Sequence, residues 1–175
     1  MRWCLHYEMT LMNPFSIIDP DPDPEQELTD RAWRTYGPPA LRFATVLVGP
    51  DDAHDIATSA FLRVTNSTGW VGLDQPQSYL FRAVSSEAHN HQRQRFRRWR
   101  RDLHAITAHD AIDSPVDVDV IQALSKLTIA QRSVVFLTYW TDMTEAAVAD
   151  TLGLSTGTVH RTLVRARIQL RKALS

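Results

Sequence analysis

The chain has 175 residues, a formal net charge of −1, 43% hydrophobic and 22% charged residues, and one cysteine, Cys4. This length suits one medium domain or two small ones, and the composition is ordinary for a globular protein in water. A single cysteine excludes an intrachain disulfide, and no apolar run is long enough for a membrane span, so we expect a cytoplasmic protein without a membrane contact.

The small net charge is the sum of blocks that lie apart in the sequence. Acidic residues gather in DPDPDPEQE, residues 19–27, whereas basic residues gather in RQRFRRWRR, residues 93–101, and in the tail from Arg161 to Lys172. Alternating proline prevents both helix formation and packing, so residues 1–27 are predicted as a disordered acidic leader. The two basic blocks point to a nucleic-acid partner.

Helical patterns fill residues 28–101, the predicted first domain. The first pattern breaks at Gly37 and restarts through Pro38 and Pro39, which predicts two helices joined by a corner. The next, PDDAHDIATSAFLRV at residues 50–64, has one apolar face made by Ala53, Ile56, Ala57, Ala60, Phe61 and Val64. A loop separates it from a long amphipathic helix at residues 78–101, which begins with apolar Leu80, Ala83, Val84 and Ala88 and ends as an arginine arm.

Residues 102–119 are predicted as a flexible linker, since they include DAIDSPVDVD with Pro115 among small and acidic residues. A second domain follows at residues 120–175. Thr128 and Gln131 have the spacing of a capping box, and Thr144 is placed to cap the next helix. No strand pattern, repeat or glycine-rich phosphate loop is indicated, so the predicted fold class is all-α, with two small helical domains on a linker.

The stretch VADTLGLSTGTVHRTLVRAR, residues 148–167, places a turn between two short helical patterns. Gly153 can adopt the left-handed conformation that ends the first helix, and Ser155 can cap the second. The second helix has an apolar stripe of Val159, Leu163, Ala166 and Leu170, and a polar side with Thr158, Arg161, Thr162 and Arg165. No Asp or Glu occurs from Ser155 to Ser175. These features predict a helix-turn-helix whose second helix enters a DNA major groove.

At these residues the chain resembles the extracytoplasmic-function (ECF) sigma factors of the sigma-70 family. LTIAQRSVVFLTYW and MTEAAVADTLGLSTGTVHRTLVRARIQLRKAL are similar to sigma domain 4, whose recognition helix reads the −35 promoter element. GPDDAHDIATSAFLRV is similar to the polymerase-binding helix of domain 2, and PQSYLFRAVSSEAHNHQRQRFRR to the helix that meets the −10 element. The family usually has an acidic residue at His54, Gln-Glu at Thr58-Ser59, Trp at Tyr79 and Asn at Ser86.

The resemblance implies three sets of site residues. The −35 set is Ser155, Thr156, Thr158, Arg161, Thr162, Arg165 and Arg167. The −10 set is Tyr79, Arg82, Ser86, Asn90, Arg93, Arg97 and Trp99, with Trp70 and Phe96 as further aromatic candidates. The core polymerase set is Asp52, Asp55, Thr58, Ser59 and Arg63. The chemistry is suitable, because arginine can donate two hydrogen bonds to guanine and a cationic track with aromatic groups can receive unstacked bases.

The expected function is that of a sigma factor, with core RNA polymerase and promoter DNA as partners and an anti-sigma factor as a further candidate. Two alternatives are a stand-alone helix-turn-helix regulator and a polymerase-binding protein that has lost promoter recognition. No enzyme activity, cofactor or metal site is expected. The histidines of HNH, residues 89–91, fall on different sides of a helix, and Asp51, Asp52 and Asp55 stand at a helix start, where acidic residues favour the helix dipole.

Overall fold

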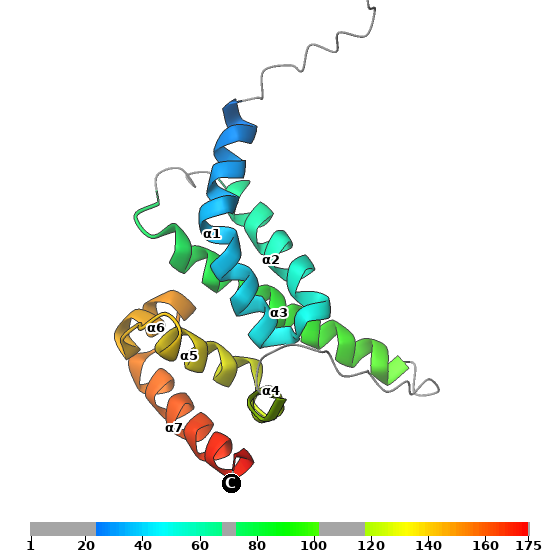
Figure 1. Cartoon of the computed structure of the whole chain (residues 1–175), viewed down its shortest axis with the longest axis vertical. Coiled ribbons are helices and arrows are strands. Elements are labelled where there is room, and N and C mark those ends of the chain that lie inside the picture. The colour runs from blue at the N-terminus through cyan, green and yellow to red at the C-terminus, as the bar shows by residue number, and fades with distance from the viewer. Residues whose placement is uncertain (1–23, 68–72, 102–117, 175) are drawn as a thin grey trace, which may run out of the picture.

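The computed structural model describes residues 24–67, 73–101 and 118–174, and these residues form an all-helical fold (Figure 1). The helices are α1 (Pro24–Val48), α2 (Pro50–Thr65), α3 (Pro76–Arg101), α4 (Val118–Ser125), α5 (Ile129–Tyr139), α6 (Glu145–Leu152) and α7 (Thr156–Ala173). The predicted fold class is confirmed. Most of the predicted leader, most of the predicted linker, and Trp70 lie outside the described residues.

The predicted break at Gly37 is wrong, because α1 continues through Gly37, Pro38 and Pro39 as one helix. Gly37 serves packing: a Cβ there would lie only 2.7 Å from the ring of Trp33. Each proline removes one backbone donor, but the carbonyl acceptors that lose their partners belong to Arg34 and Thr35, in an exposed part of the helix. Water can satisfy these carbonyls, so the helix persists.

The helices α1, α2 and α3 pack against one another to form the N-terminal unit. The predicted inward face of α2 is buried from Ala53 to Phe61, and Leu80, Ala83, Val84 and Ala88 are buried on α3, as predicted. Trp33 of α1 meets Phe61 of α2 edge to face, with ring centroids 4.9 Å apart. The start of α2 carries Asp51 and Asp52 in its first turn, which favours the positive end of the helix dipole.

The helices α4 to α7 form the C-terminal unit, and its predicted caps are confirmed. Thr128 accepts a hydrogen bond from the Gln131 backbone, and the Gln131 side chain accepts one from the Thr128 backbone, which completes the capping box of α5. Thr144 caps α6 by accepting a hydrogen bond from the backbone N–H of Ala147. The capping residues predicted from the sequence therefore begin α5 and α6 in the structure.

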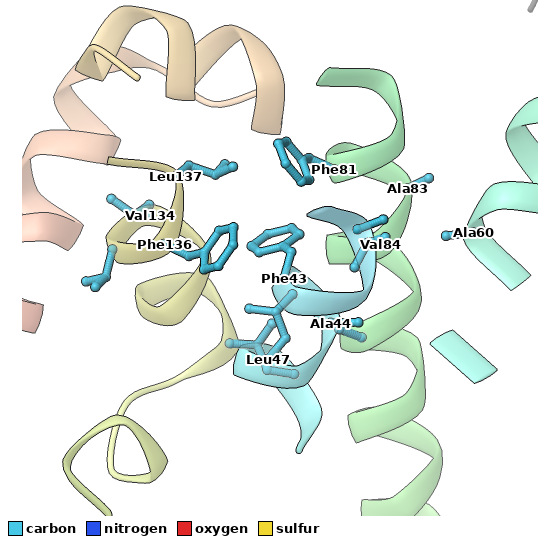
Figure 2. Packing of buried hydrophobic residues seen from close by; sticks show 14 of the residues in the cluster. Phe43, Ala44, Leu47, Ala60, Phe81, Ala83, Val84, Val134, Phe136 and Leu137 are labelled. Atoms are coloured by element: carbon cyan, nitrogen blue, oxygen red, sulfur yellow. The ribbon is translucent and has the colours of Figure 1, made fainter. Parts of the chain in front are cut away.

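The two units share one hydrophobic core, which the sequence did not predict (Figure 2). Phe43 of α1, Phe81 of α3 and Phe136 of α5 point toward one another, and the ring centroids of Phe43 and Phe136 are 5.0 Å apart. Arg132 of α5 donates to the carbonyl oxygen of Leu47 at the end of α1. Burial lowers the pKa of the Arg132 guanidinium, which still stays charged near neutral pH.

Within the described ranges, no helix combines the length and the apolar character that a membrane crossing requires.

Candidate nucleic-acid interface

The turn between α6 and α7 has the geometry of a helix-turn-helix. Gly153 ends α6 in the predicted left-handed conformation, with φ 67° and ψ 38°. Ser155 caps α7, because its hydroxyl oxygen accepts a hydrogen bond from the Thr158 backbone. Val159, Leu163 and Ala166 are buried as predicted, and they fix the rotation of α7 about its own axis. The side of α7 that faces away from the core is therefore defined by packing.

This outward side differs in part from the predicted polar side. Arg161 and Arg165 are exposed, whereas Thr158 and Thr162 are half-buried at the border of the core. Val164 is 39% exposed and Ile168 is 50% exposed, four residues apart along the helix. These two side chains were not predicted as site residues, although their spacing off the core stripe was a usable signal. The outward side thus combines arginine with branched aliphatic side chains.

The start of α7 presents small and polar groups. Ser155, Thr156 and Gly157 are exposed, and a Cβ at Gly157 would meet no atom within 4 Å. The hydroxyl oxygens of Ser155 and Thr158 lie 2.8 Å apart, and Arg161 donates to the Thr158 hydroxyl over 3.5 Å. A negatively charged oxygen can approach this end of the helix closely, because free backbone N–H groups and hydroxyls surround it.

The far end of α7 holds its arginines differently. Arg167 donates through Nε to the hydroxyl of Tyr139 at 2.7 Å, and its guanidinium lies 5.7 Å from the centre of that ring. Tyr139, Arg167, Leu170, Arg171 and Leu174 line an open groove between α5 and α7. Arg167 is therefore fixed by a neighbouring helix, unlike Arg161, which contacts only its own helix in the bond described above.

The predicted −10 residues are spread along α3 with different surroundings. Tyr79 is 50% exposed, and Ser86, Asn90 and Arg93 are exposed. Arg82 instead donates to backbone carbonyl oxygens of Asp150 and Thr151 at the end of α6. The side chains of Phe96, Arg97 and Trp99 lie outside the described part of the chain.

The predicted polymerase-binding residues on α2 also divide into two groups. Asp55 and Ser59 are exposed. In contrast, the carboxylate of Asp52 is paired with His91 at 3.6 Å and with Arg95 at 3.4 Å, both on α3.

Of the other two residues of this set, Arg63 is exposed as predicted, whereas Thr58 is half-buried, contrary to the prediction that it faces solvent or a partner. Arg63 forms an ion pair with Glu87 at 2.6 Å and donates to the Ala83 carbonyl, and the hydroxyl of Thr58 is buried without a hydrogen-bond partner. The α2–α3 packing, which single-helix periodicity does not contain, sets these orientations. Leu62, which was not predicted as a site residue, is 47% exposed on α2.

Within the residues that the structure describes, no group of three His, Cys, Asp or Glu side chains is arranged to hold a metal ion.

A capped turn between α6 and α7, with an acid-free second helix, defines a DNA-binding protein of the helix-turn-helix class.

Residues 117–170 match the sigma-70 region 4 family. The chain is 33% identical over 155 residues to an RNA polymerase sigma-E factor of Streptomyces avermitilis, with 81% of this chain and 82% of the relative covered. It is 32% identical over 158 residues to the sigma-E factor of Streptomyces coelicolor, with the same coverage. The chain belongs to the ECF group of the sigma-70 family of RNA polymerase sigma factors.

A solved structure supports the same fold over both units. The chain is similar to the sigma factor RpoE of Bartonella quintana, solved in complex with the anti-sigma factor NepR. The TM-score is 0.68 at 20% identity, and the similarity covers 85% of this chain and 97% of RpoE. As a sigma factor, this protein directs promoter-specific transcription initiation by RNA polymerase and has no enzymatic activity of its own.

Proposed function

We propose that α7 reads the −35 promoter element in the major groove, chiefly through Arg161 and Arg165. The observation that carries this proposal is the outward side of α7, which holds exposed arginines and aliphatic groups and no acidic residue. Arginine donates two hydrogen bonds to guanine, and an aliphatic side chain contacts the methyl group of thymine. Val164 and Ile168 join the predicted reading residues on this ground.

The remaining −35 residues hold the helix in the groove rather than reading bases. Ser155 and Thr156 flank the free N–H groups at the start of α7, a suitable place for a phosphate. Thr158 and Thr162 lie at the half-buried border and contact the DNA from the side of the helix. Arg167, held by Tyr139, presents a fixed positive charge to the backbone.

On α3, we assign the −10 element to the exposed residues of the predicted set. Tyr79 offers an exposed aromatic ring near the start of the helix, and Ser86, Asn90 and Arg93 continue along it toward the arginine arm. Single-stranded DNA needs such a combination, because bases stack on aromatic rings and phosphates follow positive charge. Arg97 and Trp99 complete the set as sequence-based candidates.

On α2, we assign core RNA polymerase to the patch of Asp55, Ser59 and Leu62. These residues lie at helical spacing on the exposed side of α2, and an exposed leucine between polar groups is typical of a protein contact. Asp52 and Arg63 support this patch by tying α2 to α3, and Thr58 lies inside the packing. The departures from the usual family residues at His54, Thr58 and Ser59 then adjust the polymerase contact.

An anti-sigma factor is a further proposed partner, since the similar RpoE chain was solved with one. A factor that meets core polymerase and chromosomal DNA acts in the bacterial cytoplasm, and we propose that location here.

The direct test is run-off transcription with purified core RNA polymerase on a genomic promoter library. We expect selective initiation from a set of templates that share two sequence elements. Absence of selective initiation from every template would refute the proposal. Tight DNA binding by the isolated chain, combined with no affinity for core polymerase, would instead indicate the stand-alone regulator.

A further inference from the structure

His160 on α7 is held by a carboxylate from the neighbouring helix. Its Nδ1 lies 3.2 Å from each of the two carboxylate oxygens of Glu145, the first residue of α6. No acidic residue occurs on α7 itself, so this carboxylate reaches the recognition helix from the other helix of the motif. The His160 side chain is nevertheless 62% exposed, and an ion pair this exposed contributes little to stability. Glu145 therefore fixes the direction of the imidazole ring more than it stabilises the fold.

The contact with Glu145 decides which ring nitrogen of His160 is left for a partner. A carboxylate only accepts hydrogen bonds, so Nδ1 is the nitrogen that carries the proton and donates. In the neutral ring the other nitrogen, Nε2, then has no proton and accepts. Within the described ranges Nε2 makes no hydrogen bond, and it lies across the ring from the nitrogen that Glu145 holds. The pair thus presents an oriented hydrogen-bond acceptor at the surface of α7.

The place of His160 along α7 is that of a residue which meets bases. It is the fifth residue of the helix, and the N-terminal residues of a recognition helix contact base edges. It precedes the exposed Val164 by four residues, so the two side chains are neighbours on the same side of the helix. Arg165 is about 140° away around the helix, on the other flank of the outward side. The arginine and the histidine are therefore suited to different base pairs.

We propose that His160 is a further base-reading residue of the −35 element, with Glu145 as the residue that positions it. The inference rests on the proposed reading of the −35 element by α7. In the major groove, adenine and cytosine present an amino group that donates, whereas guanine and thymine present a carbonyl oxygen that accepts. An accepting Nε2 therefore favours adenine or cytosine on the contacted strand over guanine or thymine.

The test is binding of the polymerase-bound factor to promoters that are changed one base pair at a time, at about pH 8.5, where histidine is ordinarily neutral. His160→Ala should reduce the preference for an amino-bearing base at one base pair about three- to ten-fold, the effect of one lost hydrogen bond. Preferences at the other base pairs should stay as in the parent. The helical circular-dichroism signal should also stay the same, because His160 is not part of the hydrophobic core.

Glu145→Ala should have two effects of opposite sign. It should reduce the preference at the same base pair, because the ring of His160 is no longer held. It should also strengthen binding to all sequences, because a negative charge beside the DNA is removed. A structural defect would instead weaken all promoters alike. Asp150→Ala is the matched control, since it removes the same charge from an exposed position on α6 and should leave the preference at that base pair unchanged.

The double variant separates positioning from direct contact. Once His160 is alanine, Glu145→Ala should have no further effect on the base preference, because Glu145 acts through the ring. A Glu145→Ala effect that persists in the His160→Ala background would overturn the positioning role. An unchanged base preference in His160→Ala would overturn the reading role, and a parent preference for guanine or thymine at that base pair would overturn the accepting Nε2.

Arg165→Ala, measured in the same assay, distinguishes failure of this inference from failure of the proposed function. If Arg165→Ala changes the preference at its own base pair while His160→Ala changes none, only the inference about His160 fails. If neither variant changes any base preference, the proposed reading of the −35 element by α7 fails as well.

Discussion

The same substitution, glycine to alanine, should have opposite effects on stability at two positions. At Gly37 the new Cβ would lie 2.7 Å from the ring of Trp33, which is itself packed against Phe61. Alanine gains up to about 1 kcal/mol of helix propensity over glycine, whereas overpacking costs about 1–3 kcal/mol. Gly37 also precedes Pro38, and a Cβ before proline disfavours the helical conformation. We therefore expect Gly37→Ala to destabilise the protein by about 1–2 kcal/mol.

At Gly157 no atom lies within 4 Å of the place that a Cβ would occupy, so only the propensity gain remains. Gly157→Ala should raise the free energy of unfolding by about 0.5 kcal/mol, less than the mid-helix value because the residue lies in the first turn of α7. Urea unfolding followed by circular dichroism measures both, and the two midpoints should differ by about 1 M, given a typical urea slope. The reasoning about Trp33 is refuted if Gly37→Ala unfolds at the same or a higher urea concentration than the parent.

Arg165→Ala should cost about 1–3 kcal/mol of binding free energy on the cognate −35 element and relax the preference at one base pair. Arg171→Ala should instead weaken binding to all promoters alike and lower the slope of the salt dependence by about one. If the polymerase-bound Arg165→Ala and Arg171→Ala variants both keep the base preferences of the parent, the reading role of Arg165 is contradicted. Thr128→Ala removes the cap of α5 and should lower the free energy of unfolding by about 1 kcal/mol, measured by urea unfolding. Arg132→Met removes the arginine donor from the carbonyls of Leu47, Leu124 and Ser125, of which the Leu124 carbonyl still accepts from the Leu127 backbone, and should cost about 2–4 kcal/mol in the same assay. A loss under about 1 kcal/mol would show that water replaces the arginine. Deleting residues 1–23 should leave the unfolding midpoint unchanged, because the alternating proline and aspartate of this segment disfavour both helix formation and packing; a collapse of cooperative unfolding would show that the leader packs on the body.

The elements whose signals are local were predictable from the sequence. The capping box of Thr128 and Gln131, the left-handed Gly153 and the Ser155 cap all depend on residues three or four positions away, and all are confirmed. The buried stripe of α7 follows from the 3.6-residue period in the same way. At Gly37 the local signal is misleading, because this glycine makes room for the Trp33 ring inside a continuous helix and does not form a turn.

The sequence predicted which residue types of the candidate site lie on which helix, but not which other side chains and backbone groups they contact. Periodicity placed Arg63 outward and the resemblance placed Arg82 in the −10 set; both are exposed, but each also has its partners on another helix. Val164 lies off the predicted core stripe of α7 and is exposed, but it was not predicted as a site residue. Resemblance to the family supplied the identity of the partners, which periodicity does not contain.

The sequence by itself determined the helices, their caps, the turn of the DNA-binding motif and the acid-free recognition helix, since each arises from residues within about one or two helical turns. Only the tertiary structure decided that the two units pack into one core. The bonds that join them link Arg82 to Thr151, 69 positions away, and Arg132 to Leu47, 85 positions away. Their acceptors are backbone carbonyls, which every residue possesses, so no side-chain pattern marks them in advance. Which arginine has its partners on another helix and which stays free of such contacts thus depends on how the helices come together in space.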